Sequence, residues 1–513
     1  MSLRRKYAKR SYLRSLLRYL AILFLVLLQL AMIVATVLLF NKYFAYVYIV
    51  IELLSVIIMF PLISQQRNSS NKIFWLCVVL ILPLGGHIMY QLWGRERVNH
   101  RAHKTIQQCI DGANKGQILD KEKLEEFKTL YPEEGKTAQY LFNSGFGLYS
   151  GNEVTYFEIG EKALEDMVEK CSQAREYIFI SFFTIADGVI WDKMLQVLKE
   201  RCKKGVLVYI MYDDVGSVLQ LSDTTVEEMR AAGIEVQTFN PVEYSFYSYF
   251  FNYRCHQKIL IIDGEYAYTG GINISDRYAN INSPYGHWKD VAIRIKGEAV
   301  YSMQLTFIGM YNTGKKKIDV KNFPLIPQNA GDTYCIPFAD GPSNNPDNPA
   351  LDTFINVITS AKEYVNIMTP YLIIDDTLRD AICLAAKNGV KVRIITPGIP
   401  DKKYVKLLTE RHYGTLLLAG AEIYEYTPGF VHAKVCMNES CAIVGTINMD
   451  FRSFFLHYEN GVWIPDKKVV CEIENDFEDT ISKSRKIGYE EWKRRPWYKK
   501  LVQEILYVAK CQL

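Results

Sequence analysis

The chain has 513 residues, more than one ordinary domain holds, so we expect several structural units. Its net charge of +4 at pH 7 is too small to favour nucleic acid as the main partner. The eleven cysteines are an odd number without disulfide-like spacing, which suits a reducing compartment.

Positive charge is concentrated in residues 1–19, the basic N-terminal segment. Seven arginines and lysines occur there without an acidic partner: Arg4, Arg5, Lys6, Lys9, Arg10, Arg14 and Arg18. Such a cluster fits anionic lipid headgroups and the cytoplasmic side of a membrane, and a disordered basic tail is the alternative.

Three apolar runs follow within residues 20–94, at about 20–40, 44–63 and 73–93. Each is about 20 residues long, enough for a helix to span a bilayer. Pro83-Leu84-Gly85-Gly86 in the third run could kink it or make it re-entrant. Because basic residues flank the region on both sides, two crossings and one re-entrant segment would leave both ends in the cytoplasm. We therefore predict a multi-pass protein of the cell membrane with its remaining domains on the cytoplasmic face.

Residues 95–150 are polar and mixed in charge, and they indicate a connector with helical stretches such as 121–130. Beyond it, short β-branched and aromatic runs alternate with helical patterns at 159–174, 190–204 and 376–387. This rhythm is typical of an α/β fold, and it occurs twice. The repeat predicts two homologous domains, residues 151–330 and 331–513, which share one active site.

Each repeat carries the same pattern of reactive residues. The first has His256-Gln257-Lys258 followed by Asp263, and the second has His432-Ala433-Lys434 followed by Glu439. Each run closes on a glycine-containing turn and an asparagine, Asn273 in the first and Asn448 in the second. Residues two apart on a strand point to the same face, so each motif sets an imidazole beside an ammonium. Two such pairs brought together would suit attack on a phosphodiester and would hold its negative oxygens.

These motifs resemble those of the phospholipase D superfamily, and within it those of the bacterial cardiolipin synthases. The resemblance runs from about residue 50 onward. It includes Trp288-Lys289-Asp290, Thr369-Pro370-Tyr371, and residues 448–454 leading to Glu459. It implies two phospholipase D-like domains behind a transmembrane region, and transfer of a phosphatidyl group between two phosphatidylglycerol molecules to give cardiolipin and glycerol. No metal or other cofactor is implied.

The resemblance also implies roles for individual residues. His256 would be the nucleophile that forms a phosphohistidine, and His432 would be the general acid and base; the near-symmetric sequence alone leaves this order open. Lys258 and Lys434, with Asn273 and Asn448, would bind the nonbridging oxygens. Asp290 and Glu459 would orient the histidines.

Asp263 and Glu439 complete the two motifs and are counted with the catalytic residues. The Asp263-Gly264 pair nevertheless favours a hairpin turn, so Asp263 could be structural. In the second motif the family aspartate is replaced by Glu439, or by Asn438 when the motif is aligned from the following glycine. A turn former is available in either case.

Seven aromatic residues lie between Tyr244 and Tyr253, just before the first motif. They could be buried core, or an interfacial wedge that admits a lipid tail while Arg254 meets headgroups. The expected partners are phosphatidylglycerol and other anionic membrane lipids, and not nucleic acid. A phospholipase D-type hydrolase or another phosphatidyltransferase is the alternative, while a nuclease or a lipid-binding scaffold fits the membrane spans and intact motifs less well.

Overall fold

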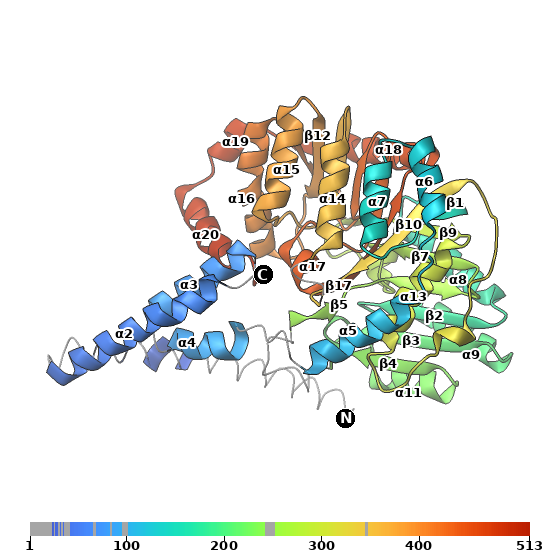
Figure 1. Cartoon of the computed structure of the whole chain (residues 1–513), viewed down its shortest axis with the longest axis horizontal. Coiled ribbons are helices and arrows are strands. Elements are labelled where there is room, and N and C mark those ends of the chain that lie inside the picture. The colour runs from blue at the N-terminus through green and yellow to red at the C-terminus, as the bar shows by residue number, and fades with distance from the viewer. Residues whose placement is uncertain are drawn as a thin grey trace.

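A computed structural model of the chain describes residues 42–64, 68–82, 85–94, 101–241, 252–343 and 347–512, with scattered helical positions between 23 and 34. Figure 1 shows a mixed α/β body from which the N-terminal helices project to one side. The apolar run at 20–40 and the aromatic residues 244–251 lie largely or wholly outside the described residues.

The N-terminal region forms helices α2 (Lys42–Ile63), α3 (Ser69–Ile81) and α4 (Gly85–Met89), and then a π-helix at Tyr90–Gly94. In the third apolar run, α3 ends at Ile81 and α4 begins at Gly85; Pro83 and Leu84, where the sequence predicted a kink, lie outside the described residues. Among the described residues, no helix combines the length and apolar character needed to cross a bilayer. The predicted crossings and their topology stay predictions.

The predicted connector is helical and touches both halves of the body. It contains α5 (Arg101–Asn114), α6 (Lys121–Leu130) and α7 (Gly135–Asn143). Helix α6 begins where expected, because Asp120 caps it by accepting a hydrogen bond from the Lys123 amide at 3.0 Å. Helix α5 lies against α13 (Ala299–Tyr311) of the first half, whereas Leu124 and Phe127 of α6 join the core of the second half.

The predicted βαβ rhythm is present in both halves. The first half has β1 (Tyr149–Phe157), β2 (Tyr177–Phe182), β3 (Leu207–Asp213), β4 (Glu235–Phe239), β6 (Ile259–Ile262), β7 (Tyr266–Gly270) and β9 (Ala292–Lys296), with α8 (Gly160–Gln173), α9 (Val189–Lys203), α10 (Asp214–Ser217) and α11 (Asp223–Ala231). The helices predicted at 159–174 and 190–204 are confirmed as α8 and α9.

The second half repeats this order. Its strands are β10 (Thr333–Asp340), β11 (Tyr364–Met368), β12 (Lys391–Pro397), β13 (Glu422–Tyr426), β15 (Val435–Asn438), β16 (Ala442–Gly445), β17 (His457–Ile464) and β18 (Ser484–Ile487). Its helices are α14 (Pro349–Ser360), α15 (Asp376–Lys387), α16 (Lys403–Ala419), α17 (Phe451–Phe455), α18 (Lys467–Ser482), α19 (Tyr489–Lys493) and α20 (Trp497–Val508). Helix α15 matches the pattern predicted at 376–387.

The two halves form one continuous sheet. Strands β1 and β10 pair antiparallel, and from this junction the order is β1-β9-β7-β6-β2-β3-β4 on one side and β10-β17-β16-β15-β11-β12-β13-β18 on the other. The two orders mirror each other, as a duplicated domain requires. One apolar core, which includes side chains of α13 and α18, runs beneath both halves. A buried ion pair between Lys289 and Asp476, at 2.7 Å, also joins them.

Candidate active site

Each motif histidine follows a short strand that pairs with the opposite half. Strand β5 (Arg254–Cys255) runs parallel to the start of β17, and β14 (Gly429–Val431) runs parallel to β8 (His287–Lys289). The His256 amide donates to the Tyr458 carbonyl at 2.8 Å, and the His432 amide donates to the Lys289 carbonyl at 2.7 Å. The backbone of each half therefore positions the histidine of the other.

The two carboxylates bind the histidines crosswise. His256 Nδ1 lies 2.9 Å from both Oε1 and Oε2 of Glu459, and His432 Nδ1 lies 2.7 Å from Asp290 Oδ2. A carboxylate can only accept, so a neutral imidazole donates its Nδ1–H and keeps the lone pair on Nε2. The sequence placed a carboxylate after each histidine but did not reveal that each one serves the histidine of the other repeat.

Burial and positive charge keep the imidazoles neutral. Burial is the main cause that lowers the pKa of His256 and His432 well below the ordinary value, and the charges of Lys258 and Lys434 lower both further. Burial also lowers the pKa of Lys258 to about 8 and that of Lys434 to about 7. Two neutral imidazoles beside two cations suit attack on an anionic centre.

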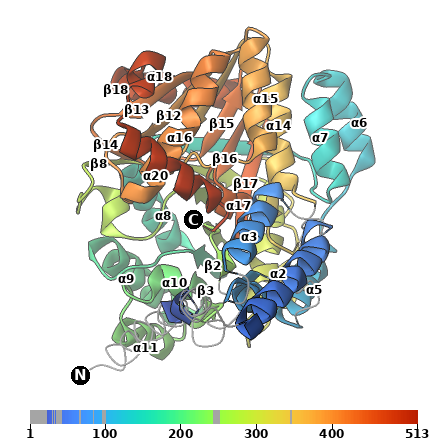
Figure 2. The same ribbon diagram turned by 90° about the vertical axis from the view of Figure 1, so that its left-hand side faces the viewer.

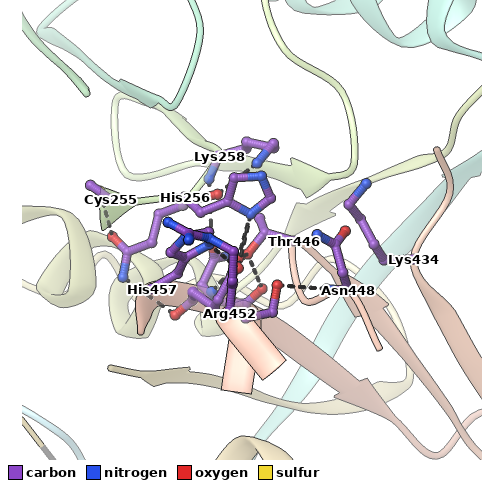
Figure 3. A network of polar contacts seen from close by, with 12 residues as sticks. Cys255, His256, Lys258, Lys434, Thr446, Asn448, Arg452 and His457 are labelled. Atoms are coloured by element: carbon purple, nitrogen blue, oxygen red, sulfur yellow. Dashed lines mark hydrogen bonds and ion pairs between the residues drawn. The ribbon is translucent and has the colours of Figure 1, made fainter. Parts of the chain in front are cut away.

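The lysines and asparagines lie beside the histidines. Lys258 Nζ donates to the His256 carbonyl at 2.6 Å, and Lys434 Nζ donates to the His432 carbonyl. The Asn273 amide donates to the Tyr278 hydroxyl at 2.6 Å, and the Asn448 amide donates to Asp450 at 3.0 Å. Each amide group has two N–H donors, so one remains for a ligand. Figure 3 shows the network around His256, with Lys434 and Asn448 of the second motif beside it.

Around His256, sequence reasoning missed three polar residues. Thr446 donates to Glu459 Oε2 at 2.6 Å, and the His457 ring lies 5.5 Å from the His256 ring. His457 and Glu459 are two apart on β17 and share a face, a spacing that could have revealed the pairing. Arg452 Nε donates to His457 Nε2 at 3.3 Å.

Among the described residues, His256, His457 and Glu459 are the one group whose ligand atoms, all within 4.8 Å of one another, could hold a metal ion. A metal would need the Nδ1 lone pair of His457. Because Arg452 donates to Nε2, that nitrogen holds the ring's lone pair and Nδ1 carries the proton. The Nδ1–H of His457 therefore points its proton toward Glu459, whose Oε1 lies 3.6 Å away, and leaves no lone pair there for a metal.

The surroundings of His432 are aromatic. The rings of Trp288 and Tyr278 lie 5.2 and 5.3 Å from the imidazole. Gly271 is required where the two halves meet, because a Cβ there would lie 2.0 Å from Asp290 Oδ1. Trp288 stands two residues before Asp290, as His457 stands two before Glu459, so equivalent positions hold an indole in one half and an imidazole in the other.

A cavity of about 520 Å³ lies near the first motif but is not this site. Its lining includes Gln257 and Tyr458, together with residues of α5, α7 and α13. Gln257 stands between His256 and Lys258 in the short segment that joins β5 to β6. The histidines and lysines of the two motifs do not line this cavity.

The expectation that Arg254 meets lipid headgroups is wrong. Arg254 is buried, and its guanidinium donates to the Asn240 carbonyl at 2.8 Å and lies 3.5 Å from Asp213. Asp213 also accepts the Cys255 amide at 2.9 Å, so this buried pair fixes the strand that precedes His256. Tyr253 belongs to the core, and Tyr247, Phe250 and Phe251 lie outside the described residues.

Asp263 follows the end of β6 that is far from Lys258, and an advance of five residues along a strand spans about 16 Å. Its carboxylate accepts the amides of Arg175, Glu176 and Tyr177 at 2.7 to 2.8 Å. Both Asp263 and Gly264 have positive φ, as a type I′ hairpin turn requires. Counting Asp263 with the catalytic residues is therefore a mistake, and the hairpin interpretation is correct.

Glu439 makes the equivalent contacts in the second half. It accepts the amides of Lys362, Glu363 and Tyr364 at 2.8, 3.3 and 3.4 Å, so it too lies away from the histidines. Asn438 instead closes the turn, accepting the Cys441 amide at 2.9 Å. In the first half Asp263 both binds the three amides and forms the turn, whereas in the second half Glu439 binds the amides and Asn438 forms the turn. Counting Glu439 with the catalytic residues is therefore also a mistake.

Comparison with known proteins gives the family. A family model described as "Cardiolipin synthase, PLD-like domain" matches residues 167–300 and 354–481, and one described as "Phospholipase_D-nuclease N-terminal" matches residues 46–95. The chain is 36% identical to an uncharacterized protein of Streptococcus mutans serotype c, over 83% of this chain and 93% of that protein. It is 32% identical to cardiolipin synthase 1 of Staphylococcus aureus strain MRSA252, over 87% of this chain and 92% of that enzyme.

A solved structure shares the fold. The crystal structure of a phosphatidylserine synthase from Haemophilus influenzae aligns with a TM-score of 0.56 at 16% identity, over 74% of this chain and all of that one. The family match covers both halves that carry a His-x-Lys motif, and the relatives match over nearly their full length. The chain therefore belongs to the cardiolipin synthase family of phospholipase D-like enzymes.

Proposed function

We propose that the chain joins two phosphatidylglycerol molecules into cardiolipin and releases glycerol, through a phosphohistidine on His256. The observation that carries the proposal is the crosswise pairing of two neutral imidazoles with two buried carboxylates. It supplies two Nε2 lone pairs, one for attack on phosphorus and one for proton transfer.

In the first step, His256 Nε2 attacks the phosphorus of one phosphatidylglycerol and forms a P–N bond. The P–O bond to the glycerol headgroup breaks, and protonated His432 gives its proton to the departing oxygen. The Asp290 carboxylate, 2.7 Å from His432 Nδ1, stabilises the imidazolium that this step needs. The phosphate of the bound lipid also favours the protonated form, because it brings negative charge to a buried cationic pocket.

In the second step, neutral His432 takes the proton from the terminal hydroxyl of a second phosphatidylglycerol. That oxygen attacks phosphorus, the P–N bond breaks, and cardiolipin leaves. Lys258 and Lys434 bind the nonbridging oxygens in both steps, with the remaining N–H groups of Asn273 and Asn448. Preorganised donors of this kind contribute about 3 kcal/mol each in well-studied enzymes. Water in place of the second lipid would give hydrolysis instead.

The lipid substrate requires a bilayer, and we propose that the N-terminal helices hold the enzyme there with its catalytic halves on the cytoplasmic face. The exposed apolar side chains of α2, such as Leu53, Ile57 and Phe60, support attachment to lipid. The basic segment at residues 1–19 would bind anionic headgroups.

The test is to incubate the full chain with labelled phosphatidylglycerol in detergent, with a chelator, and to identify the lipid products. Cardiolipin and an equal amount of glycerol are expected. Phosphatidic acid as the main product would assign a hydrolase, and a strict need for added divalent cation would contradict the lysine-based mechanism. Acid-labile label should appear on the peptide that contains His256, and label on His432 would reverse the two roles.

A further inference from the structure

Helix α20, near the end of the chain, presents a continuous apolar face to solvent. Trp497 is 75% exposed and Ile505 is 63% exposed. The face consists of Trp497, Tyr498, Leu501, Val502, Ile505 and Val508, which we call the α20 face. These positions follow helical spacing and fall within one side of the helix. Aromatic and branched side chains gathered on one exposed face mark an interaction surface.

The opposite side of α20 is fixed to the protein body. Gln503 is fully buried and donates to the Leu407 carbonyl of α16 at 3.0 Å. Glu504 binds Arg411 at 2.6 Å, and Lys499 binds Glu410 at 2.5 Å. These contacts fix the orientation of α20, so its apolar face stays directed to solvent.

Exposed basic residues lie before α20 and on its flank, together with the exposed acids Glu490, Glu491 and Glu504. Lys493 and Arg494 precede the helix and are exposed, and Lys500 is exposed on its flank. An apolar face rich in tryptophan and tyrosine, bordered by lysine and arginine, is the composition of a helix that lies in the interface of an anionic bilayer. This segment lies beyond residue 481, where the match to the cardiolipin synthase domain ends.

The C-terminal end of α20 lies against the N-terminal helix α3. The Cys511 thiol, just after α20, donates to the Ser70 carbonyl in α3 at 3.7 Å. In Figure 1, α2 projects from the side of the body on which α20 lies. Figure 2 turns that side toward the viewer and shows α20 in front, together with α3 and α2. Helices that carry apolar surfaces from opposite ends of the chain thus lie on the same side of the body.

We propose that α20 lies in the headgroup region of an anionic bilayer and holds the catalytic body against the membrane surface. The docked side of α20 binds α16, and the α20 face enters the lipid. The proposal concerns attachment and does not depend on the chemistry at His256.

The test uses the full chain reconstituted into phosphatidylglycerol vesicles that contain lipid brominated near the headgroup, which quenches nearby tryptophan. The part of the quenching that is lost in Trp497→Phe reports on Trp497 alone, because the other six tryptophans are unchanged. We expect at least twofold quenching of the Trp497 emission. Quenching should weaken in zwitterionic vesicles and in the triple variant Lys493→Gln, Arg494→Gln, Lys500→Gln.

A second variant, Leu501→Ser, Val502→Ser, Ile505→Ser, keeps Trp497 as the reporter and should reduce its quenching at least twofold. The matched control is Leu207→Ser, Leu219→Ser, Ile281→Ser, which removes three equally exposed apolar side chains from the first half and should leave the quenching unchanged. Equal quenching in the wild type and in Trp497→Phe would overturn the proposal, and this comparison stands even if the triple serine variant fails to fold. A wild-type dimer in detergent that the serine variant reduces to a monomer would assign the face to a second copy instead.

Discussion

The two halves of the active site share a backbone frame but differ in what surrounds each histidine. Each imidazole follows a two- or three-residue strand paired with the opposite half, and each binds a carboxylate from that half. His256 has a polar setting in which Glu459 also accepts from Thr446 and lies near His457. His432 has a shorter acid, Asp290, and aromatic neighbours in Trp288 and Tyr278.

This difference bears on the division of labour that the near-symmetric motifs leave open. Glu459 contacts His256 with both oxygens and is held by Thr446, so it fixes the ring as a nucleophile needs. His432 is held by one Asp290 oxygen and has two aromatic rings beside it, Trp288 and Tyr278, where His256 has one, Phe183 at 5.1 Å. Aromatic rings attract a cation, so the larger number beside His432 favours a ring that must become charged. The surroundings thus favour His256 as nucleophile and His432 as general acid and base.

The largest effect is expected from removing either histidine. His256→Ala and His432→Ala should each reduce phosphatidyl transfer by at least about 10⁴-fold, because each ring acts on the same phosphorus. A substrate with a nitrophenol leaving group needs no acid, so it should restore adduct formation in His432→Ala and not in His256→Ala. Single-turnover release of nitrophenol measures this, with circular dichroism as the control for folding. Restoration in His256→Ala alone would exchange the two roles.

The second largest effect is expected from replacing the carboxylates that bind the histidines. Glu459→Gln and Asp290→Asn keep the size of each side chain but can present an amide donor to Nδ1, which favours the wrong tautomer. We expect a loss of about 10² to 10⁴ in kcat for each. Glu459→Gln should slow the appearance of the adduct, whereas Asp290→Asn should slow proton transfer and be partly offset by the nitrophenol substrate. The same response from both variants would show that the two half-sites are chemically equivalent.

A smaller effect concerns pH. The lysines act as ammonium ions, and burial lowers the pKa of Lys434 to about 7 and that of Lys258 to about 8. A lysine loses its charge as pH rises through its pKa, so kcat/KM should fall on the alkaline side. Lys434 has the lower pKa, so its deprotonation should cause the first part of this fall. Lys434→Arg keeps the charge and should move this alkaline limb upward, while Lys258→Arg should leave its onset in place. The measurement is a profile of kcat/KM against pH for both variants. An unchanged onset in Lys434→Arg would contradict the assignment of the alkaline fall to Lys434.

The smallest effect on activity is expected at the ends of the motifs. Asp263→Ala should lower the free energy of unfolding by about 2 kcal/mol, because three short amide hydrogen bonds and a residue suited to positive φ are lost. Glu439→Ala should cost about 1 kcal/mol, since only one of its three contacts is short. Urea unfolding in detergent measures both, and activity per folded molecule should change less than twofold. A loss of activity without a loss of stability would show that these residues take part in catalysis.

Local pattern made much of the fold predictable. Helices α8, α9 and α15 have the 3.6-residue periodicity that indicates an amphipathic helix, and α15 begins at its capping aspartate, Asp375. Helix α3 ends at Ile81, just before the Pro-Leu-Gly-Gly cluster of the third apolar run. Strand β18 and helix α20 were not predicted. Strand β18 is a short edge strand, and α20 has no counterpart in the first repeat that could have drawn attention to it.

The sequence by itself determined that the chain is a duplicated α/β protein with two His-x-Lys motifs, because the motifs and the strand and helix patterns around them recur in the same order. The motifs were expected on strands, but each lies in a short segment between two strands. Only the tertiary structure decided which carboxylate serves which histidine, since the partners are 203 and 142 residues apart. It also decided that Asp263 and Glu439 hold strand ends and that Arg254 is buried against Asp213. These outcomes depend on which chain segments meet when the two halves close into one sheet, and such long-range pairing leaves no periodic trace in the sequence.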